Sequence, residues 1–255
     1  MNFEGLGKGP IAKIYSEDDK SINLPIYLDG ENFNRGTSND QLNVADGMKL
    51  QHLPNNAVST REILYIAGRS GSGKSYYAMR YIKEYKKKYK DREVYLFTYL
   101  TEEDQTLRDL KVKKFKLDKK FLEAELEIGF FEKSLVIFDD IDFITDKAIY
   151  KKVRDILDKI LGTGRHKEIS CIYTSHILTN NVQTKMILNE CHSITVFPSG
   201  LPKRNIDYLL EAYLGFDKID IGKVKSIKSR WITFFKTFPI VVMYETGAYI
   251  PDSGS

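Results

Sequence analysis

One short segment constrains the fold of this chain more than any other. Residues Ile63–Ala67 form an apolar run that leads into Gly68, and Gly73, Lys74 and Ser75 then open a stretch with helical periodicity. In the order strand, loop and helix, the pattern G-x-x-x-x-G-K-S is typical of a phosphate-binding loop. Its glycines let successive backbone N–H groups point into one concavity, and the N-terminus of the helix adds a favourable dipole. The sequence therefore predicts a strand–loop–helix unit that binds phosphate.

The side chains of this loop have distinct expected roles. Lys74 is expected to reach the β- and γ-phosphates, and the Ser75 hydroxyl is expected to ligate Mg²⁺. An accidental match in a surface loop is the alternative, but the strand before the loop and the helix after it argue against that. The residues expected to contact ATP are Gly68, Arg69, Ser70, Gly71, Ser72, Gly73, Lys74, Ser75 and Tyr76.

A second apolar run, residues 135–138, ends in Asp139 and Asp140. A continuous apolar run is typical of a parallel strand that is covered on both faces. Doubly wound sheets bind ligands at the carboxyl ends of their strands. We expect Asp139 to hold the hydration shell of Mg²⁺ opposite Ser75, and Asp140 to polarise the water that attacks the γ-phosphate. An aspartate that caps a helix after a core strand is the alternative.

Composition sets the broad class. The chain has 255 residues, and a hydrophobic content of 42% with 29% charged residues is typical of a folded α/β domain with appendages. The net charge of +4 permits a polyanionic partner without requiring one. Cys171 and Cys191 are interpreted as reduced thiols. No apolar run approaches the length of a membrane span, so we expect a soluble, intracellular protein with no membrane partner.

Three regions follow from the pattern along the chain. Residues 1–60 are interpreted as an N-terminal arm, with a β-hairpin at 11–27 and a polar, turn-prone stretch at 32–56. Residues 61–200 alternate strands with helices, which predicts a mostly parallel central sheet with flanking helices. The expected strands are 63–67, 93–98, 135–138, 169–174 and 193–197, and the expected helices are 74–90, 147–161 and 181–190.

Residues 201–255 are interpreted as a C-terminal appendage. A helix is expected at 206–214, and two strands at 231–236 and 240–245 are expected to form a β-hairpin. The tail at 251–255 is expected to be disordered.

Two further groups are candidates for the site. Ser175 and His176 end the strand 169–174, which in phosphate-loop folds lies between the first strand and the acidic strand. Either side chain could sense the γ-phosphate, with a slight preference for Ser175, or could simply cap the strand.

Arg165 lies in the loop before this strand, where an arginine could act on the nucleotide of a neighbouring subunit. A surface arginine paired with an acid is an equal alternative at this point, and Arg230 is a weaker candidate for the same role.

Lysines are dense at 83–92, 111–120 and 223–230. They could follow a nucleic-acid backbone, although a solvated surface is the more common role of such runs. The spacing of the histidines and cysteines does not match a zinc site.

Taken together, the phosphate loop 68–75, the pair Asp139 and Asp140, and the segment 164–170 resemble the FtsK–HerA-type ATPases that package viral DNA, as found in nucleocytoplasmic large DNA viruses and virophages. The resemblance covers about residues 61–200. It implies that Arg165 is the arginine that acts in trans. That family usually carries glutamine where Ser175 and His176 stand.

The resulting hypothesis is an ATP-hydrolysing motor of the RecA-like class that translocates double-stranded DNA as a homo-oligomeric ring, with ATP and Mg²⁺ as cofactors. Its expected task is to package a viral genome, with a capsid or portal protein as a further partner, in the cytoplasmic virus factory or the virion. A small-molecule or nucleoside kinase is one alternative; acidic residues at 102–104 fit it, but no arginine-rich lid is evident. A non-catalytic nucleotide-dependent switch is another, and Asp140 argues against it.

Overall fold

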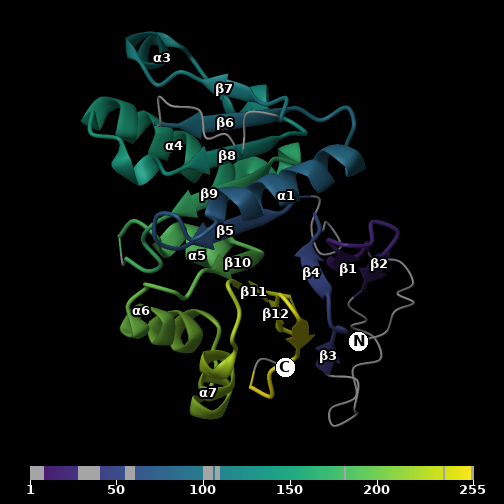
Figure 1. Ribbon diagram of the computed structural model, residues 1–255. Coiled ribbons are helices and arrows are strands. Elements are labelled where there is room, and N and C mark those ends of the chain that lie inside the picture. Colours follow the sequence, from purple (N-terminus) through teal and green to yellow (C-terminus); the bar gives the residue numbers. More distant parts are fainter. Residues whose placement is uncertain are drawn as a thin grey trace.

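A central β-sheet organises the molecule, which we describe from a computed structural model (Figure 1). The structure describes residues 9–27, 41–54, 61–99, 106, 110–180, 182–237 and 239–253. The acidic segment at 102–104 and part of the predicted N-terminal arm lie outside these residues. The strands of the sheet are β3 (Gln41–Asn43), β5 (Ile63–Ala67), β6 (Val94–Thr98), β7 (Lys113–Phe115), β8 (Leu135–Asp139), β9 (Ser170–Ser175), β10 (Ser193–Val196), β11 (Ile232–Phe235), β12 (Val241–Tyr244) and β13 (Gly247–Tyr249).

Within the described residues the order of the sheet is β3-β13-β12-β11-β10-β5-β9-β8-β6-β7. The pairs from β10 to β7 are all parallel, whereas β11, β12, β13 and β3 add to the other side of β10 in antiparallel fashion. The predicted α/β fold with a mostly parallel central sheet is confirmed. So is the predicted place of β9 between β5 and β8, which brings the end of β9 between the phosphate loop and the acidic pair.

The helices predicted from the sequence are present with bounds close to those expected, and two further helices, at 119–123 and 218–226, were not predicted. The α-helices are α1 (Lys74–Lys88), α3 (Lys119–Glu123), α4 (Lys147–Thr163), α5 (Lys185–Glu190), α6 (Lys203–Tyr208) and α7 (Lys218–Ser226). Short 3₁₀ turns are η1 (Ile128–Phe131), η2 (Ile141–Phe143) and η3 (Gly164–Lys167), and η4 (Leu209–Tyr213) is a π-helix that continues α6. Helix α5 begins four residues later than the predicted residue 181 (185 against 181).

The two faces of β5 belong to two hydrophobic cores. Side chains alternate along a strand, so Ile63 and Tyr65 pack with α4 and α5 on one face, and Leu64 and Ile66 pack with α1 on the other. Helix α1 crosses the sheet over β5 and β9 (Figure 1). All five residues of β5 are fully buried. This double covering explains why the strand reads as a continuous apolar run.

The N-terminal region contains more regular structure than its sequence predicts. β1 (Ala12–Ser16) and β2 (Asn23–Ile26) form the predicted hairpin, and β4 (Met48–His52) pairs with β1 to complete a three-stranded sheet. Strands β3 and β4 both lie in the stretch that was predicted to be a polar arm. Their partners are distant in sequence, since β3 pairs with β13 near the C-terminus, so local pattern alone could not reveal them.

The C-terminal hairpin is confirmed, and it continues the central sheet because β11 pairs with β10. The predicted disorder of the tail is wrong for its first residues. Pro251 is buried, and the backbone N–H and the hydroxyl of Ser253 both donate to Asp220 Oδ2, at 2.9 and 2.5 Å. The division of the chain at residues 60 and 200 stays a prediction.

Two expectations from composition concern cysteines and membranes. Cys171 and Cys191 are buried free thiols, and burial raises the pKa of each to about 12, which makes them unreactive at neutral pH. In the part of the chain that the structure describes, no helix combines the length and the apolar character needed to cross a bilayer.

A buried carboxylate connects the N-terminal sheet to the central one. Glu62, just before β5, accepts hydrogen bonds from Tyr81 Oη of α1 at 2.7 Å and Ser193 Oγ of β10 at 3.0 Å. Its Oε1 atom also lies 2.9 Å from His52 Nε2 of β4. Glu62 and His52 are 5% and 2% exposed. A buried charge needs several such partners, so this cluster holds the N-terminal sheet, α1 and β10 in one arrangement.

We expect Glu62→Ala to lower the free energy of unfolding by about 3 kcal/mol, because three buried polar groups would lose their acceptor. Glu17→Ala is the matched control, since Glu17 forms an exposed ion pair with Lys49; its expected cost is below about 1 kcal/mol. Guanidinium denaturation of both variants measures the difference. A loss for Glu62→Ala no larger than that for Glu17→Ala would contradict the role of this cluster.

Candidate nucleotide-binding site

The loop between β5 and α1 has the backbone geometry of a phosphate cradle. Gly71 and Gly73 have φ values of +71° and +111°, a region that side chains other than glycine rarely adopt. A Cβ atom on Gly68 would lie 2.7 Å from Phe197 Cβ and 2.8 Å from Ser72 Oγ, so only glycine fits there. The glycines identified in the sequence are therefore required by the turn.

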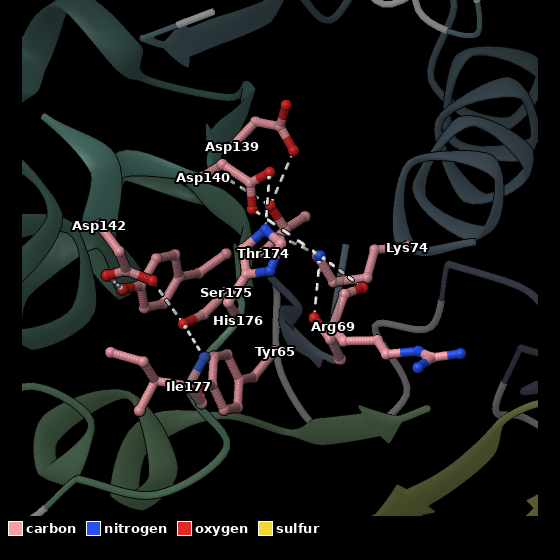
Figure 2. A network of polar contacts seen from close by, with 12 residues as sticks. Tyr65, Arg69, Lys74, Asp139, Asp140, Asp142, Thr174, Ser175, His176 and Ile177 are labelled. Carbon is pink, nitrogen blue, oxygen red and sulfur yellow. Dashed lines mark hydrogen bonds and ion pairs between the residues drawn. The ribbon is translucent and has the colours of Figure 1, made fainter. Parts of the chain in front are cut away.

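Lys74 begins α1 and turns back over the loop. Its side chain is 6% exposed, and Nζ donates to the carbonyl oxygen of Gly68 at 2.9 Å. Nζ also lies 3.2 Å from His176 Nε2 and 3.9 Å from Asp140 Oδ1 (Figure 2). Burial lowers the pKa of Lys74, and the nearby carboxylates of Asp140 and Asp139 oppose that shift. The ammonium group thus stands between the loop and the acidic strand.

The two adjacent acids at the end of β8 point in different directions. β8 and β9 pair in register so that Asp139 lies opposite Thr174, whose hydroxyl donates to Asp139 Oδ1 at 2.7 Å and accepts from the backbone N–H of Asp140 at 3.1 Å. Asp140 has a φ of +48°, which ends the strand and turns its carboxylate toward Lys74 and His176 (Figure 2). The register of β8 on β9 therefore separates the surroundings of the two carboxylates.

Two buried oxygen atoms at this site have no hydrogen-bond partner among the described residues. They are Asp140 Oδ1 and Ser72 Oγ. Burying a polar atom without a partner is costly. The other oxygen of Asp140, Oδ2, lies 3.2 Å from His176 Nε2. The site thus has unused hydrogen-bonding capacity on both the loop and the acidic strand, which a polar ligand with its waters would satisfy.

The structure separates the two candidates at the end of β9. Ser175 is fully buried, and its hydroxyl donates to Asp142 Oδ2 at 2.5 Å and accepts from the N–H of Ile177 at 2.9 Å. Tyr173 Oη donates to the other oxygen of Asp142 at 2.6 Å. Ser175 thus faces Asp142, and His176 faces Lys74 and Asp140 (Figure 2). Asp142, two residues beyond the acidic pair, was not singled out from the sequence.

The two candidate arginines occupy different places. Arg165 is exposed in η3, which directly precedes β9. The phosphate loop lies at the carboxyl ends of the parallel strands, whereas Arg165 lies at the amino end of β9. The length of β9, about 20 Å at 3.3 Å per residue, therefore separates Arg165 from the phosphate loop of its own chain. Arg230 was the weaker candidate, yet its Nε atom donates to the carbonyl oxygen of Ser72 at 3.0 Å. The structure brings Arg230, and not Arg165, to the loop of the same chain.

The remaining predicted ligands lie along the loop and the first turn of α1. Ser75 is partly buried in that turn, and Tyr76 beside it is 50% exposed. Ser70 is exposed, and Arg69 lies over Gly200, with its side chain directed away from the acids (Figure 2).

The residues present suit Mg²⁺ bound together with a phosphate ligand. No cluster of three or more His, Cys, Asp or Glu side chains that could hold a metal alone occurs among the described residues. Mg²⁺ in nucleotide sites uses one or two protein oxygens, with phosphates and waters completing its shell. The Ser75 hydroxyl and the Asp139 carboxylate are oxygen ligands of that kind.

Comparison with known proteins places the chain. No protein-family profile matches it. It is 42% identical to the uncharacterised protein V3 of Sputnik virophage over 190 residues, and this alignment covers 74% of this chain and 76% of V3. Its structure is similar to that of the genome packaging NTPase B204 of Sulfolobus turreted icosahedral virus 2 in complex with AMPPCP, with a TM-score of 0.50 and 17% identity over 73% of this chain and 98% of B204.

A second similar structure is the cytoplasmic domain of the type VII secretion ATPase EccC of Thermomonospora curvata. The TM-score is 0.51 and the identity 11%, over 86% of this chain and 30% of the EccC chain. At these identities the two structures show a shared fold. The identity to V3 goes further, and the chain therefore belongs to the same virophage protein family as V3 of Sputnik virophage, on a fold found in a viral genome packaging NTPase.

Proposed function

We propose that this protein hydrolyses ATP to translocate double-stranded DNA, and that its task is to package a viral genome into a capsid. The observation that carries the proposal is the meeting of Lys74, Asp140 and His176 beside a glycine-built phosphate cradle. The virophage origin of V3 and the description of B204 as a genome packaging NTPase support the choice of DNA packaging.

The chemistry assigned to the site is transfer of the γ-phosphoryl group to water. The loop N–H groups and Lys74 bind the phosphates, and Asp140, through its Oδ1 atom, which has no hydrogen-bond partner among the described residues, orients the attacking water and accepts its proton. The bond between the γ-phosphorus and the bridging oxygen breaks, and ADP leaves. Mg²⁺, held by Ser75 and Asp139, would supply charge neutralisation at the β- and γ-phosphates. We assign the sensor role to His176, because Ser175 is bonded to Asp142.

The Oδ1 atom of Asp140, which has no hydrogen-bond partner among the described residues, also favours hydrolysis over a non-catalytic switch. A protein that only binds nucleotide needs the metal-holding acid, Asp139, but has no use for a second buried carboxylate oxygen aimed at the same site. Hydrolysis needs such a group near the γ-phosphate.

A homo-oligomeric ring is part of the proposal. Arg165 is exposed and stands at the opposite edge of the sheet from its own phosphate loop. If it contributes to hydrolysis, it must therefore do so at a site on another subunit, where an arginine stabilises the developing charge. A capsid or portal protein is the proposed docking partner of the ring.

The first test is ATP turnover with and without duplex DNA. We expect the protein to hydrolyse ATP in the presence of Mg²⁺ and duplex DNA to raise the rate, with a gain that shrinks as salt screens the phosphate contacts. Lys74→Ala should abolish turnover under both conditions, because it removes the charge that faces the β- and γ-phosphates. Wild-type turnover in Lys74→Ala would refute the phosphate-loop assignment, and a rate unchanged by DNA at low salt would refute translocation.

The second test separates nucleotide binding from chemistry. Asp140→Asn should bind Mg·ATP normally and hydrolyse it about a hundredfold more slowly, because the amide accepts protons poorly. Asp139→Asn should also raise the Mg²⁺ concentration needed for half-maximal binding. Among the strand-end variants, His176→Gln should slow hydrolysis more than Ser175→Ala does. Equal and mild effects of the two aspartate changes on turnover would contradict this division of roles.

The third test mixes inactive subunits. Arg165→Ala subunits should bind ATP but fail to hydrolyse it, and adding Asp140→Asn subunits should restore part of the activity. In a mixed ring, an intact Asp140 on one subunit can meet an intact Arg165 from its neighbour. An arginine that acts within its own chain gives no such rescue. If the mixture forms rings, as measured by light scattering, and still shows no more activity than its components, the trans role of Arg165 is wrong.

A further inference from the structure

We infer that Arg230 binds the nucleotide held by the phosphate loop of its own chain, at the end that carries the α-phosphate and the nucleoside. The inference rests on the proposed function, since it takes the loop as an ATP site. It adds a ligand contact from the C-terminal hairpin, a region that the resemblance to packaging ATPases did not cover.

The guanidinium group of Arg230 lies directly against the loop. Its Nε atom donates to the carbonyl oxygen of Ser72 at 3.0 Å. A Cβ atom built on Gly73 would lie 3.1 to 3.3 Å from three guanidinium atoms, so glycine at this position also makes room for the arginine. Among the described residues the two terminal nitrogens of Arg230 have no hydrogen-bond partner, and the side chain is exposed. They are available to a ligand.

The hairpin holds Arg230 in this position. The backbone N–H of Arg230 donates to Glu245 Oε2 at 2.8 Å, and the hydroxyl of Ser229 donates to the same oxygen at 3.2 Å. The next residue, Trp231, is 8% exposed and packs edge-on against the ring of Tyr77 in α1, with ring centroids 5.2 Å apart. Arg230 is thus fixed both to the hairpin and to the helix that begins at the loop.

A neighbouring pocket indicates which end of the nucleotide Arg230 meets. The pocket, about 100 Å³ in volume, is lined by Gly73, Tyr76 and Arg80 on the side of α1, by Gln51 of β4, and by Arg230 and Trp231. Lys74, Asp139, Asp140 and His176 are not among its lining residues. The groups assigned to the γ-phosphate therefore lie outside this pocket, which adjoins the loop at Gly73. The proposed path of the nucleotide runs from Lys74, at the γ-phosphate, to Arg230 and the pocket, at the nucleoside.

The chemistry of the pocket suits that end of a nucleotide. An arginine is always charged, and its two terminal nitrogens can donate side by side to a phosphate. On the opposite wall, the guanidinium of Arg80 stacks over the ring of Tyr15 with its centre 3.9 Å from the ring centroid, beside the exposed ring of Tyr76. These flat groups suit contact with a base or ribose. The N-terminal sheet, through Tyr15 and Gln51, then forms one wall of the nucleotide site.

Titration calorimetry of the full-length protein with AMPPCP and with ADP tests the inference. We expect Arg230→Ala to weaken both ligands equally, by about ten- to a hundredfold, as expected for the loss of a charge-assisted contact. Arg230→Glu should weaken both further. Lys228→Ala is the matched control, because Lys228 is exposed two residues away and its loss removes the same charge; it should bind both ligands like the wild type. Melting temperatures of all variants report on folding.

The outcomes separate this inference from the proposed function. If the wild type binds neither AMPPCP nor ADP, the proposed function fails and Arg230 fails with it. If the wild type binds both and Arg230→Ala binds them equally well, the assignment of Arg230 is wrong while the phosphate loop stands. A loss confined to AMPPCP would place Arg230 at the γ-phosphate and overturn its assignment to the nucleoside end. Should Arg230→Ala fold poorly, a folded Arg230→Glu with wild-type affinity would refute the inference by itself.

Discussion

The candidate site depends on how tightly strand β5 is held. Strand β9 pairs with one edge of β5 and strand β10 with the other, and hydrophobic cores cover both faces of β5. The chain leaves this strand at Gly68, whose N–H donates to the carbonyl oxygen of Ser175 at 3.1 Å. The start of the phosphate loop and the end of β9 are therefore joined by a backbone hydrogen bond. Because the strands are parallel, the acidic end of β8 reaches the same edge of the sheet.

A buried chain of polar groups connects this edge to the terminal regions. Tyr77 Oη of α1 bonds to Thr233 Oγ1 of β11 at 2.7 Å and lies 3.2 Å from His52 Nδ1 of β4, while His52 Nε2 meets Glu62. These groups are satisfied only when the N-terminal sheet, α1 and the C-terminal hairpin are together. The segments outside the predicted core are thus packed around the helix that begins at the phosphate loop, which is where Arg230 and the adjoining pocket lie.

The acidic pair illustrates how one strand end can serve two purposes. The hydroxyl of Thr174 holds both residues, because it donates to the carboxylate of Asp139 and accepts from the backbone N–H of Asp140. The left-handed backbone of Asp140 then directs the second carboxylate to Lys74 and His176. Residues in this backbone conformation recur at functional sites. The proposed split between a metal-holding and a water-orienting acid has a backbone cause, the end of the strand between the two residues.

The sequence by itself determined strands β5, β6, β8, β9 and β10 of the parallel core, the phosphate loop and the acidic pair, because burial on both faces and glycine-only turns leave local patterns. The short strand β7, which is exposed or only partly buried, was not predicted. Only the tertiary structure decided which strand-end side chain meets Lys74: adjacent residues point to opposite sides, so Ser175 meets Asp142 and His176 meets the loop. It also brought Arg230 to Ser72, 158 positions away, and paired β3 with β13. Such contacts depend on the order of strands in the sheet and on loop conformation, which no local periodicity encodes.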